Sequence, residues 1–262
     1  MLSLLELYRG QLLVFLLTFT RIAGLVLAAP VFGSRRVPVH VRVLLAVAAA
    51  LLVAPVHGGS LTHRDVNAEL VLALFREALL GLVLGLALLI LVAGLQAAGQ
   101  LVGQMSGLSL AEVTDPDFGD STPLIGRLYD LVASTAFVLL GGHRLVLQAL
   151  LDSFRWMPPG QVQLAGDLLE TLSQVAAQSF TLSVRVAAPV LAALLLATLV
   201  LGLIGRVLPT MNVFSIGFSL NTLLVMAVLS LSLGGAAWLF EEQATASVQA
   251  VVQLWESTGV RR

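Results

Sequence analysis

Two sets of residues at helical spacing, one of glutamines and one of glycines, are the best candidates for function in this sequence. They consist of Gln96, Gln100 and Gln104 and of Gly99, Gly103 and Gly107. Residues four apart lie on one face of a helix, so each set forms a stripe. Carboxamides that faced lipid would leave donors and acceptors unpaired, and glycines allow another helix to approach closely. The pattern predicts either an edge that touches water or the polar groups of other chains, or a tight intramolecular helix pair with a few amide hydrogen bonds.

The segment after these stripes favours the first alternative. Residues 105–111 are mostly small or flexible, and an acidic loop that contains proline and glycine continues to Pro123. Such a composition is typical of a turn or a flexible loop. A flexible element that leaves a wet helix end is what a pore lining and its gate would need.

Arg21 lies inside an apolar segment, and no Asp or Glu lies within one helical turn of it. An arginine in such a segment is either a functional group with an acidic partner or a residue near a helix end whose long side chain reaches the aqueous interface. We therefore expect either an ion pair between subunits or a snorkelling side chain at this position.

The sequence lacks the residue constellations of familiar enzymes. It has no Cys, and all of its 14 cationic residues are Arg, which excludes thiol nucleophiles, Cys-ligated metals and Schiff-base or P-loop lysines. Its four His residues have no metal-ligand spacing. A net charge of -1 argues against a nucleic-acid-binding face. We expect no catalysis, no cofactor, no metal and no nucleic-acid partner.

The elements that must position these residues are membrane-type helices. Hydrophobic residues make up 58% of the chain and charged residues 11%, with a mean hydropathy of +0.98. Runs of about 20 residues with few or no charges can cross the hydrocarbon as helices. We expect six hydrophobic segments, at about residues 10–34, 41–58, 74–106, 128–154, 180–205 and 212–240. The fold class is therefore all-α, of the integral membrane type.

Two features of these segments depart from simple crossings. Residues 78–111 carry no charge, and as a helix they would run about 50 Å, beyond a hydrocarbon core of roughly 30 Å. Such a helix must tilt, break or stand partly in protein. The segment 128–154 is interrupted at residues 141–144, so a partial hairpin is as good an interpretation as a straight crossing.

Several short strings, in order along residues 12–240, resemble the FliR family of flagellar export-gate proteins and its injectisome relatives of the SctT type. They are residues 19–22 (FTRI), 29–38 (APVFGSRRVP), 100–105 (QLVGQM) with Asp115 and Pro116, Gly142 and His143 with 145–154, 185–189 (RVAAP), 202–206 (GLIGR), 209–214 (PTMNVF) and 216–218 (IGF). Each string is weak alone, whereas the ordered set is specific. Residues 209–211 depart from the family, which often has Pro-Gln-Met there.

The resemblance implies a single export-gate domain over residues 1–262, whose helical hairpins stand in a ring with FliP- and FliQ-type subunits. Segments of the chain resemble both partners, which implies a FliP-like and FliQ-like composite in a hetero-oligomer. FlhB-type and FlhA-type components and unfolded secreted substrates would be further partners. The protein would be located in the bacterial inner membrane, within a flagellar basal body or an injectisome base. The implied function is passage of unfolded protein through a central channel.

By the same resemblance, a plug maps to about residues 105–123. Its sealing side chains would be Met105, Leu108, Leu110 and Phe118. Methionine is flexible and can repack around varied cargo. The alternative for these four residues is ordinary loop anchoring. Two rival classes also stay open: a small-solute transporter that uses Glu77 or Asp130, and a membrane scaffold without a channel.

Overall fold

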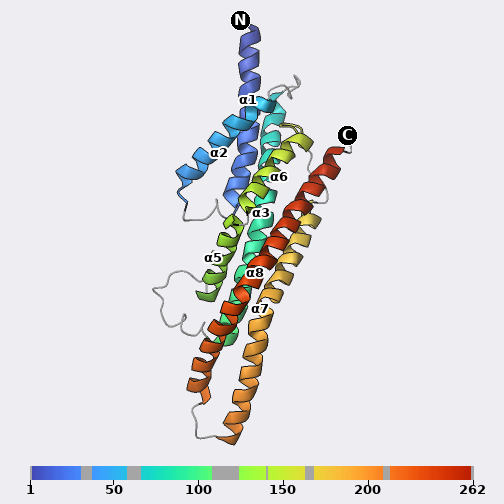
Figure 1. Ribbon diagram of the computed structural model, residues 1–262. Helices are drawn as coiled ribbons and strands as arrows, with labels where there is room; N and C mark the ends of the chain where they lie inside the picture. The colour runs from blue at the N-terminus through green and yellow to red at the C-terminus, as the bar shows by residue number, and fades with distance from the viewer. Residues whose placement is uncertain are drawn as a thin grey trace. The chain divides into compact units, whose positions relative to one another are not determined.

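Almost all of the described part of the chain is helical, as apolar segments must be if their backbone groups are to stay paired in lipid. The computed structural model describes residues 2–30, 37–57, 66–107, 124–139, 141–162, 168–208 and 213–260, and contains no strand among them. The helices are α1 Leu2–Ala28, α2 Val39–Val53, the short 3-10 helix η1 Ala54–His57, α3 Val66–Ser106, α5 Leu124–Leu139, α6 Gly142–Trp156, α7 Leu168–Val207 and α8 Val213–Val260 (Figure 1). Within these ranges five helices are long and apolar enough to cross a membrane, and α5 with α6 would make a sixth. The prediction of an all-α, membrane-type fold is confirmed.

Helices α7 and α8 extend beyond the hydrophobic segments that mark them in the sequence. α8 continues to Val260, although its apolar run ends at residue 240. Buried side chains in this extension recur every three or four residues and are Ala244, Ser247, Val248, Val251 and Trp255. α7 begins at Leu168, before the expected start near residue 180. Hydropathy detects runs of membrane length, whereas a helix also continues wherever one of its faces packs inside the protein.

The expected segment 128–154 is two helices. α5 ends at Leu139 and α6 begins at Gly142. Gly141 lies between them with φ 77°, a left-handed conformation that glycine adopts without steric cost. The structure therefore favours the broken segment over the straight crossing.

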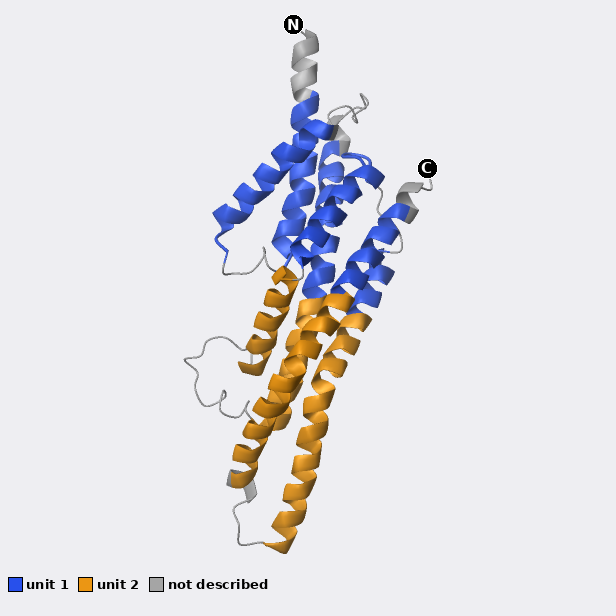
Figure 2. Ribbon diagram, in the orientation of Figure 1, with its two compact units in different colours: residues 1–90, 141–176, 244–262 blue, residues 91–140, 177–243 orange. Residues whose placement is uncertain are grey.

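The chain forms two compact units, each assembled from separate stretches of sequence. Unit 1 consists of residues 1–90, 141–176 and 244–262, and unit 2 of residues 91–140 and 177–243 (Figure 2). Helices α3, α7 and α8 each contribute residues to both units. Arg21 belongs to unit 1, and the glutamine stripe belongs to unit 2.

In unit 1, α1 and α3 cross with their backbones in contact. A Cβ atom added at Gly81 would overlap the carbonyl oxygen of Arg21, and one added at Gly85 would lie 2.6 Å from Cβ of Ala28. Gly81 and Gly85 have the Gly-x-x-x-Gly spacing that permits close helix packing in membranes. Glu77 lies one turn before Gly81 on α3, so the crossing brings this acid beside Arg21.

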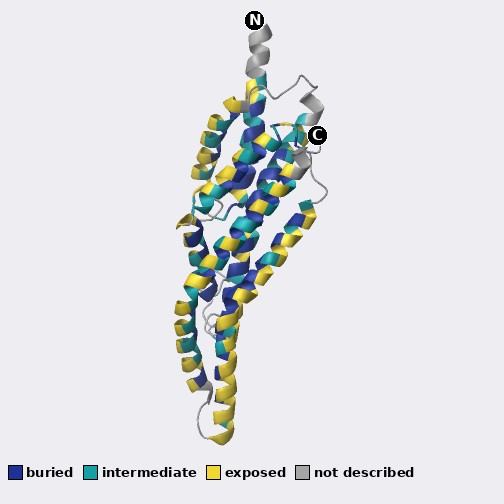
Figure 3. Cartoon of the chain, turned by 45° about the vertical axis from the view of Figure 1, so that its right-hand side comes forward, coloured by how far each residue is buried: buried dark blue, intermediate teal, exposed yellow. Residues whose placement is uncertain are grey.

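Many large apolar residues are exposed, and Figure 3 shows exposed positions along the helices. One exposed stripe on α7, between Arg185 and Arg206, consists of Ala188, Pro189, Ala192, Leu195, Leu196, Leu199, Val200 and Leu203. The helix rises about 30 Å between the two arginines, which equals the hydrocarbon thickness of a bilayer. A continuous apolar surface of this kind needs lipid or apolar neighbours to cover it.

Candidate functional site

The glutamine stripe occupies the last three turns of α3, in unit 2, and has a paired part and an exposed part. Nε2 of Gln96 donates a hydrogen bond to Oδ1 of Asp130 on α5, at 3.0 Å. Gln100 and Gln104, which lie nearer the end of the helix, are exposed. Gln96 therefore fastens α3 to α5, and the two exposed amides are placed to meet water or another chain.

The glycine stripe packs within the chain at the same end of α3. A Cβ atom added at Gly99 would lie 2.6 Å from Cα of Gly126 on α5. Gly103 is also buried. Gly107 follows the end of the helix with φ 81°, and its N–H donates to the carbonyl of Gln104 at 3.3 Å. At Gly99 the close approach is thus intramolecular, as the second sequence alternative had it, and Gly107 lies at the helix end.

The outer face of this helix end mixes amide and apolar groups. We define the α3 edge as Gln100, Leu101, Gln104 and Met105, all of which are exposed. Met105 is 56% exposed and Leu101 is 37% exposed. The edge contains no ionisable side chain, so it can exchange hydrogen bonds with water without holding a charged group tightly. Of the predicted plug residues only Met105 is described, because Leu108, Leu110 and Phe118 lie outside the described residues.

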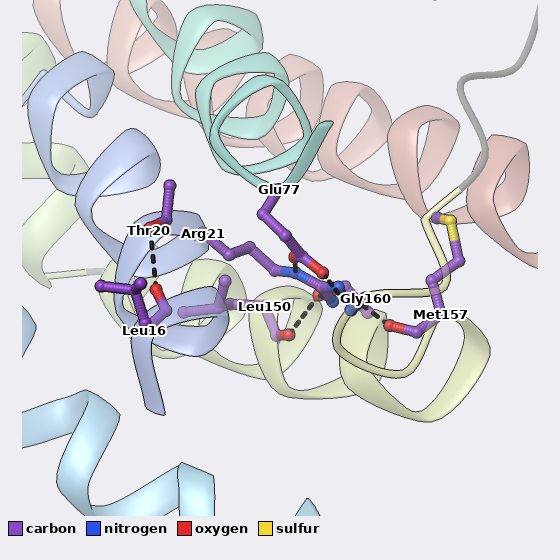
Figure 4. Close-up of polar contacts among 8 residues, drawn as sticks. Leu16, Thr20, Arg21, Glu77, Leu150, Met157 and Gly160 are labelled. Carbon is purple, nitrogen blue, oxygen red and sulfur yellow. Dashed lines mark hydrogen bonds and ion pairs between the residues drawn. The ribbon is translucent and has the colours of Figure 1, made fainter. Parts of the chain in front are cut away.

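Unit 1 contains a buried polar cluster around Arg21 (Figure 4). Nε of Arg21 donates to Oε2 of Glu77 at 2.5 Å, and both side chains are 0% exposed. Nη1 donates to the Ser153 hydroxyl at 3.1 Å, and Nη2 donates to the Met157 carbonyl at 2.9 Å. The Arg21 guanidinium carbon also lies 4.2 Å from the ring centroid of Phe154, in a cation–π contact. A buried arginine must have its donors satisfied in this way, because isolated charges are costly in an apolar interior.

The acidic partner is equally well satisfied. The second carboxylate oxygen of Glu77 accepts a hydrogen bond from the backbone N–H of Gly160, at 2.8 Å. The Ser153 hydroxyl, which accepts from Arg21, donates in turn to the carbonyl of Leu150 at 2.6 Å. Three helices and the turn after α6 thus meet at a single ion pair.

The structure corrects both expectations for Arg21. Its ion pair lies within the chain, since Glu77 is on α3 of the same chain, and its side chain does not reach an aqueous interface. No acid lies within one helical turn of Arg21, and its partner Glu77 is 56 residues away along the chain. The Gly-x-x-x-Gly spacing of Gly81 and Gly85 is the sequence signal that the helix with Glu77 packs closely against another helix.

Ser153, Met157 and Gly160 were missed as members of this cluster. Met157 contributes only its carbonyl and Gly160 only its N–H, so their side chains carry no signal of this role. The string Pro158-Pro159-Gly160 does predict a turn. No group of three or more potential metal-ligating side chains lies together in the described part of the chain.

Comparison with known proteins places these features in a family context. The sequence matches the family of bacterial export proteins, family 1, over residues 12–246. Relatives include the flagellar biosynthetic protein FliR of Caulobacter vibrioides, which is 28% identical over 234 residues that cover 89% of this chain and 93% of the relative. FliR of Bacillus subtilis is 32% identical over 79% of this chain and 81% of its own length. FliR of Escherichia coli is 30% identical over 77% of each. The family match includes Arg21, Glu77 and the α3 edge.

Proposed function

The chain belongs to the bacterial export proteins, family 1, and from this premise we propose that it is a subunit of the type III export gate that serves flagellar biosynthesis. In this proposal it forms a gated channel with FliP- and FliQ-type subunits, beside FlhB- and FlhA-type components. The channel passes unfolded proteins across the bacterial inner membrane. The exposed apolar surface of α7 supports the proposal, because such a surface needs neighbouring subunits or lipid to cover it.

The α3 edge is the observation that carries the proposal of a channel lining. A pore for extended polypeptide must be wet, yet it must bind its cargo weakly enough to release it. Amides, Met and Leu meet this requirement better than fixed charges do. Gln96 and Gly99 attach α3 to α5, and this attachment holds the exposed Gln100 and Gln104 in a fixed orientation.

The pore must also stay shut at rest, because an opening of that width would leak ions. We assign the seal to the segment of residues 105–123, with Met105, Leu108, Leu110 and Phe118 as its apolar groups. Met105 stands at the last turn of α3 and is exposed, which is compatible with this assignment. The driving force is assigned to other components, since the sequence has no nucleotide-binding motif.

Two alternatives receive less support. A small-solute transporter would need a free ionisable site, but both oxygens of Glu77 are hydrogen-bonded within the chain and Asp130 accepts from Gln96. An injectisome subunit of the SctT type would form the same kind of export gate in a virulence secretion system. The names of the relatives favour the flagellar system.

The gate proposal is tested by deletion of the gene and by deletion of residues 106–122. We expect loss of flagellar protein secretion and of motility in the first strain, because the ring of subunits around the channel is incomplete without this protein. We expect a raised ion permeability of the membrane in the second, because the seal is removed. Ion leak is measured as depolarisation after expression, with the full-length chain as control. Intact secretion in the strain without the gene would rule the gate out.

The lining proposal is tested by exchange of Gln100 and Gln104 together for leucine. Apolar constrictions exclude water, so we expect the secretion rate to fall at least about fivefold while the amount of protein in the membrane stays unchanged. The matched control is Gln148→Leu, which changes another exposed amide, on α6 in unit 1. An equal loss of secretion in the control, or none in the double variant, would contradict the assignment.

A further inference from the structure

The segment that follows α6 is a tight turn held by backbone contacts. The N–H of Gln161 donates to the carbonyl of Pro158 at 3.0 Å, and Gly160 has φ 82°. With Pro159 before this glycine, the geometry is that of a type II β-turn, which has proline at its second position and needs positive φ at its third. Residues 157–162, which include the turn, are called the strap below.

Two backbone groups of the strap are hydrogen-bonded to the Arg21–Glu77 pair. The carbonyl of Met157 accepts from Nη2 of Arg21 at 2.9 Å, and the N–H of Gly160 donates to Oε1 of Glu77 at 2.8 Å. Figure 4 shows Met157 and Gly160 on the chain segment that faces the carboxylate and the guanidinium. The ion pair thus holds the turn through one backbone carbonyl and one backbone N–H.

The strap also separates the pair from the surface. Gly160 is exposed, whereas Arg21 and Glu77 beneath it are 0% exposed. Three strap side chains, Met157, Pro159 and Val162, are buried and anchor it. The surface position of Gly160 means that a short displacement of the strap would let water reach the ion pair.

When the strap closes, its hydrogen bonds to the ion pair replace hydrogen bonds to water, so the number of hydrogen bonds changes little. When the strap leaves, water can replace the Met157 carbonyl and the Gly160 N–H, and this polar exchange changes the free energy little. The main cost of opening is the exposure of the buried side chains of Met157, Pro159 and Val162. Hydration of the charges offsets part of the loss, because a buried ion pair is poorly solvated. The α1–α3 crossing at Gly81 and Gly85 does not involve the strap, so it can stay packed.

We propose that residues 157–162 open and reclose over the Arg21–Glu77 pair as a strap, while α1 and α3 remain packed. Opening lets water reach the pair, and closing excludes water from it again. The proposal does not depend on the function proposed above, since it concerns a local movement of the folded chain.

The test uses thiol labelling of the full-length chain in its native membranes. The sequence contains no cysteine, so Val162→Cys provides the only thiol of this chain, on the strap but outside its hydrogen bonds. A membrane-permeant maleimide is the probe, and Leu151→Cys on the exposed face of α6 is the positive control. We expect Val162→Cys to react completely, but at least about tenfold more slowly than Leu151→Cys, because it reacts only when the strap is open.

Two strap variants decide the outcome. Gly160→Pro removes the donated N–H and cannot adopt positive φ, so labelling of Val162→Cys should accelerate at least about tenfold. Pro159→Ala loosens the turn without changing a hydrogen bond and should accelerate labelling about two- to fivefold. Labelling of Leu151→Cys should stay unchanged in both variants.

Ala87→Cys, a buried reporter on α3, shows whether the helices stay packed. It should remain unlabelled in all backgrounds. If it reacts in the Gly160→Pro chain, that variant has unfolded unit 1 and the Pro159→Ala comparison decides. A Val162 thiol that never reacts, or that reacts at one rate with and without Pro159→Ala, would overturn the proposal.

Discussion

A chain in which methionine replaces Arg21 will be present in the membrane in much smaller amounts than the wild type, because Glu77 is left charged, dry and without its partner. Removal of one member of a buried ion pair costs about 3–5 kcal/mol. The Met157 carbonyl and the Ser153 hydroxyl lose their donor at the same time. We expect the midpoint of thermal unfolding of the protein in detergent to fall by about 6–20 °C. The matched control is Arg155→Met, since Arg155 has an 81% exposed side chain and an exposed pairing with Asp152, and should show no change.

Exchange of the two charges separates this cluster from an ordinary ion pair. In the double variant Arg21→Glu with Glu77→Arg, the opposite charges are kept. The N–H of Gly160 would then face a guanidinium, and the carbonyl of Met157 would face a carboxylate, so both backbone hydrogen bonds are lost. We expect the double variant to be no more stable than Arg21→Met. Recovery of the protein level to that of the wild type would show that charge alone matters here.

The extent to which the fold could be predicted depends on what each segment packs against. Hydropathy located every membrane-length helix, because a helix in lipid must be apolar over its whole length. It did not locate the end of α8, because residues 241–260 are helical through one packed face that includes Val248, Val251 and Trp255. It also did not locate the start of α7 for the same reason.

The candidate site was predicted in part, and the limit was contact between distant residues. The spacing of Gln96, Gln100 and Gln104 correctly indicated one face of a helix, but only contact with Asp130 on α5 separates Gln96 from the other two. The partner of Arg21 could not be chosen from charge alone, since every acid in the sequence was a candidate. The string Pro158-Pro159-Gly160 is typical of a turn, but its side chains carry no signal that the turn covers an ion pair.

A second large effect is expected from a single methyl group at Gly81. A Cβ atom there would overlap the Arg21 carbonyl oxygen and lie 3.0 Å from the backbone nitrogen of Leu25, so α1 and α3 must move apart. Overpacking of a close contact costs about 1–3 kcal/mol, and here the obstacle is backbone, which cannot rotate away. We therefore expect Gly81→Ala to lower stability by about 3 kcal/mol, measured as for Arg21→Met.

A glycine in open space provides the matched control. At Gly10, on α1, no atom lies within 4 Å of the added Cβ. The same substitution should stabilise the helix there by about 0.5–1 kcal/mol, because alanine loses less backbone freedom on folding. Equal effects at Gly81 and Gly10 would mean that the crossing is not as close as the structure has it.

The two large effects should not be independent, and their coupling is the sharper measurement. Glu77 reaches Arg21 because the glycine crossing holds α3 against α1 one turn away. Once Gly81→Ala has separated the helices, the ion pair is already weakened, so Glu77→Gln should cost much less in that background than in the wild type. Neighbouring sites commonly show interaction energies of about 0.5–3 kcal/mol in such a cycle. Strict additivity would mean that the ion pair forms without the crossing, and the close approach of the two helices would then need another reason.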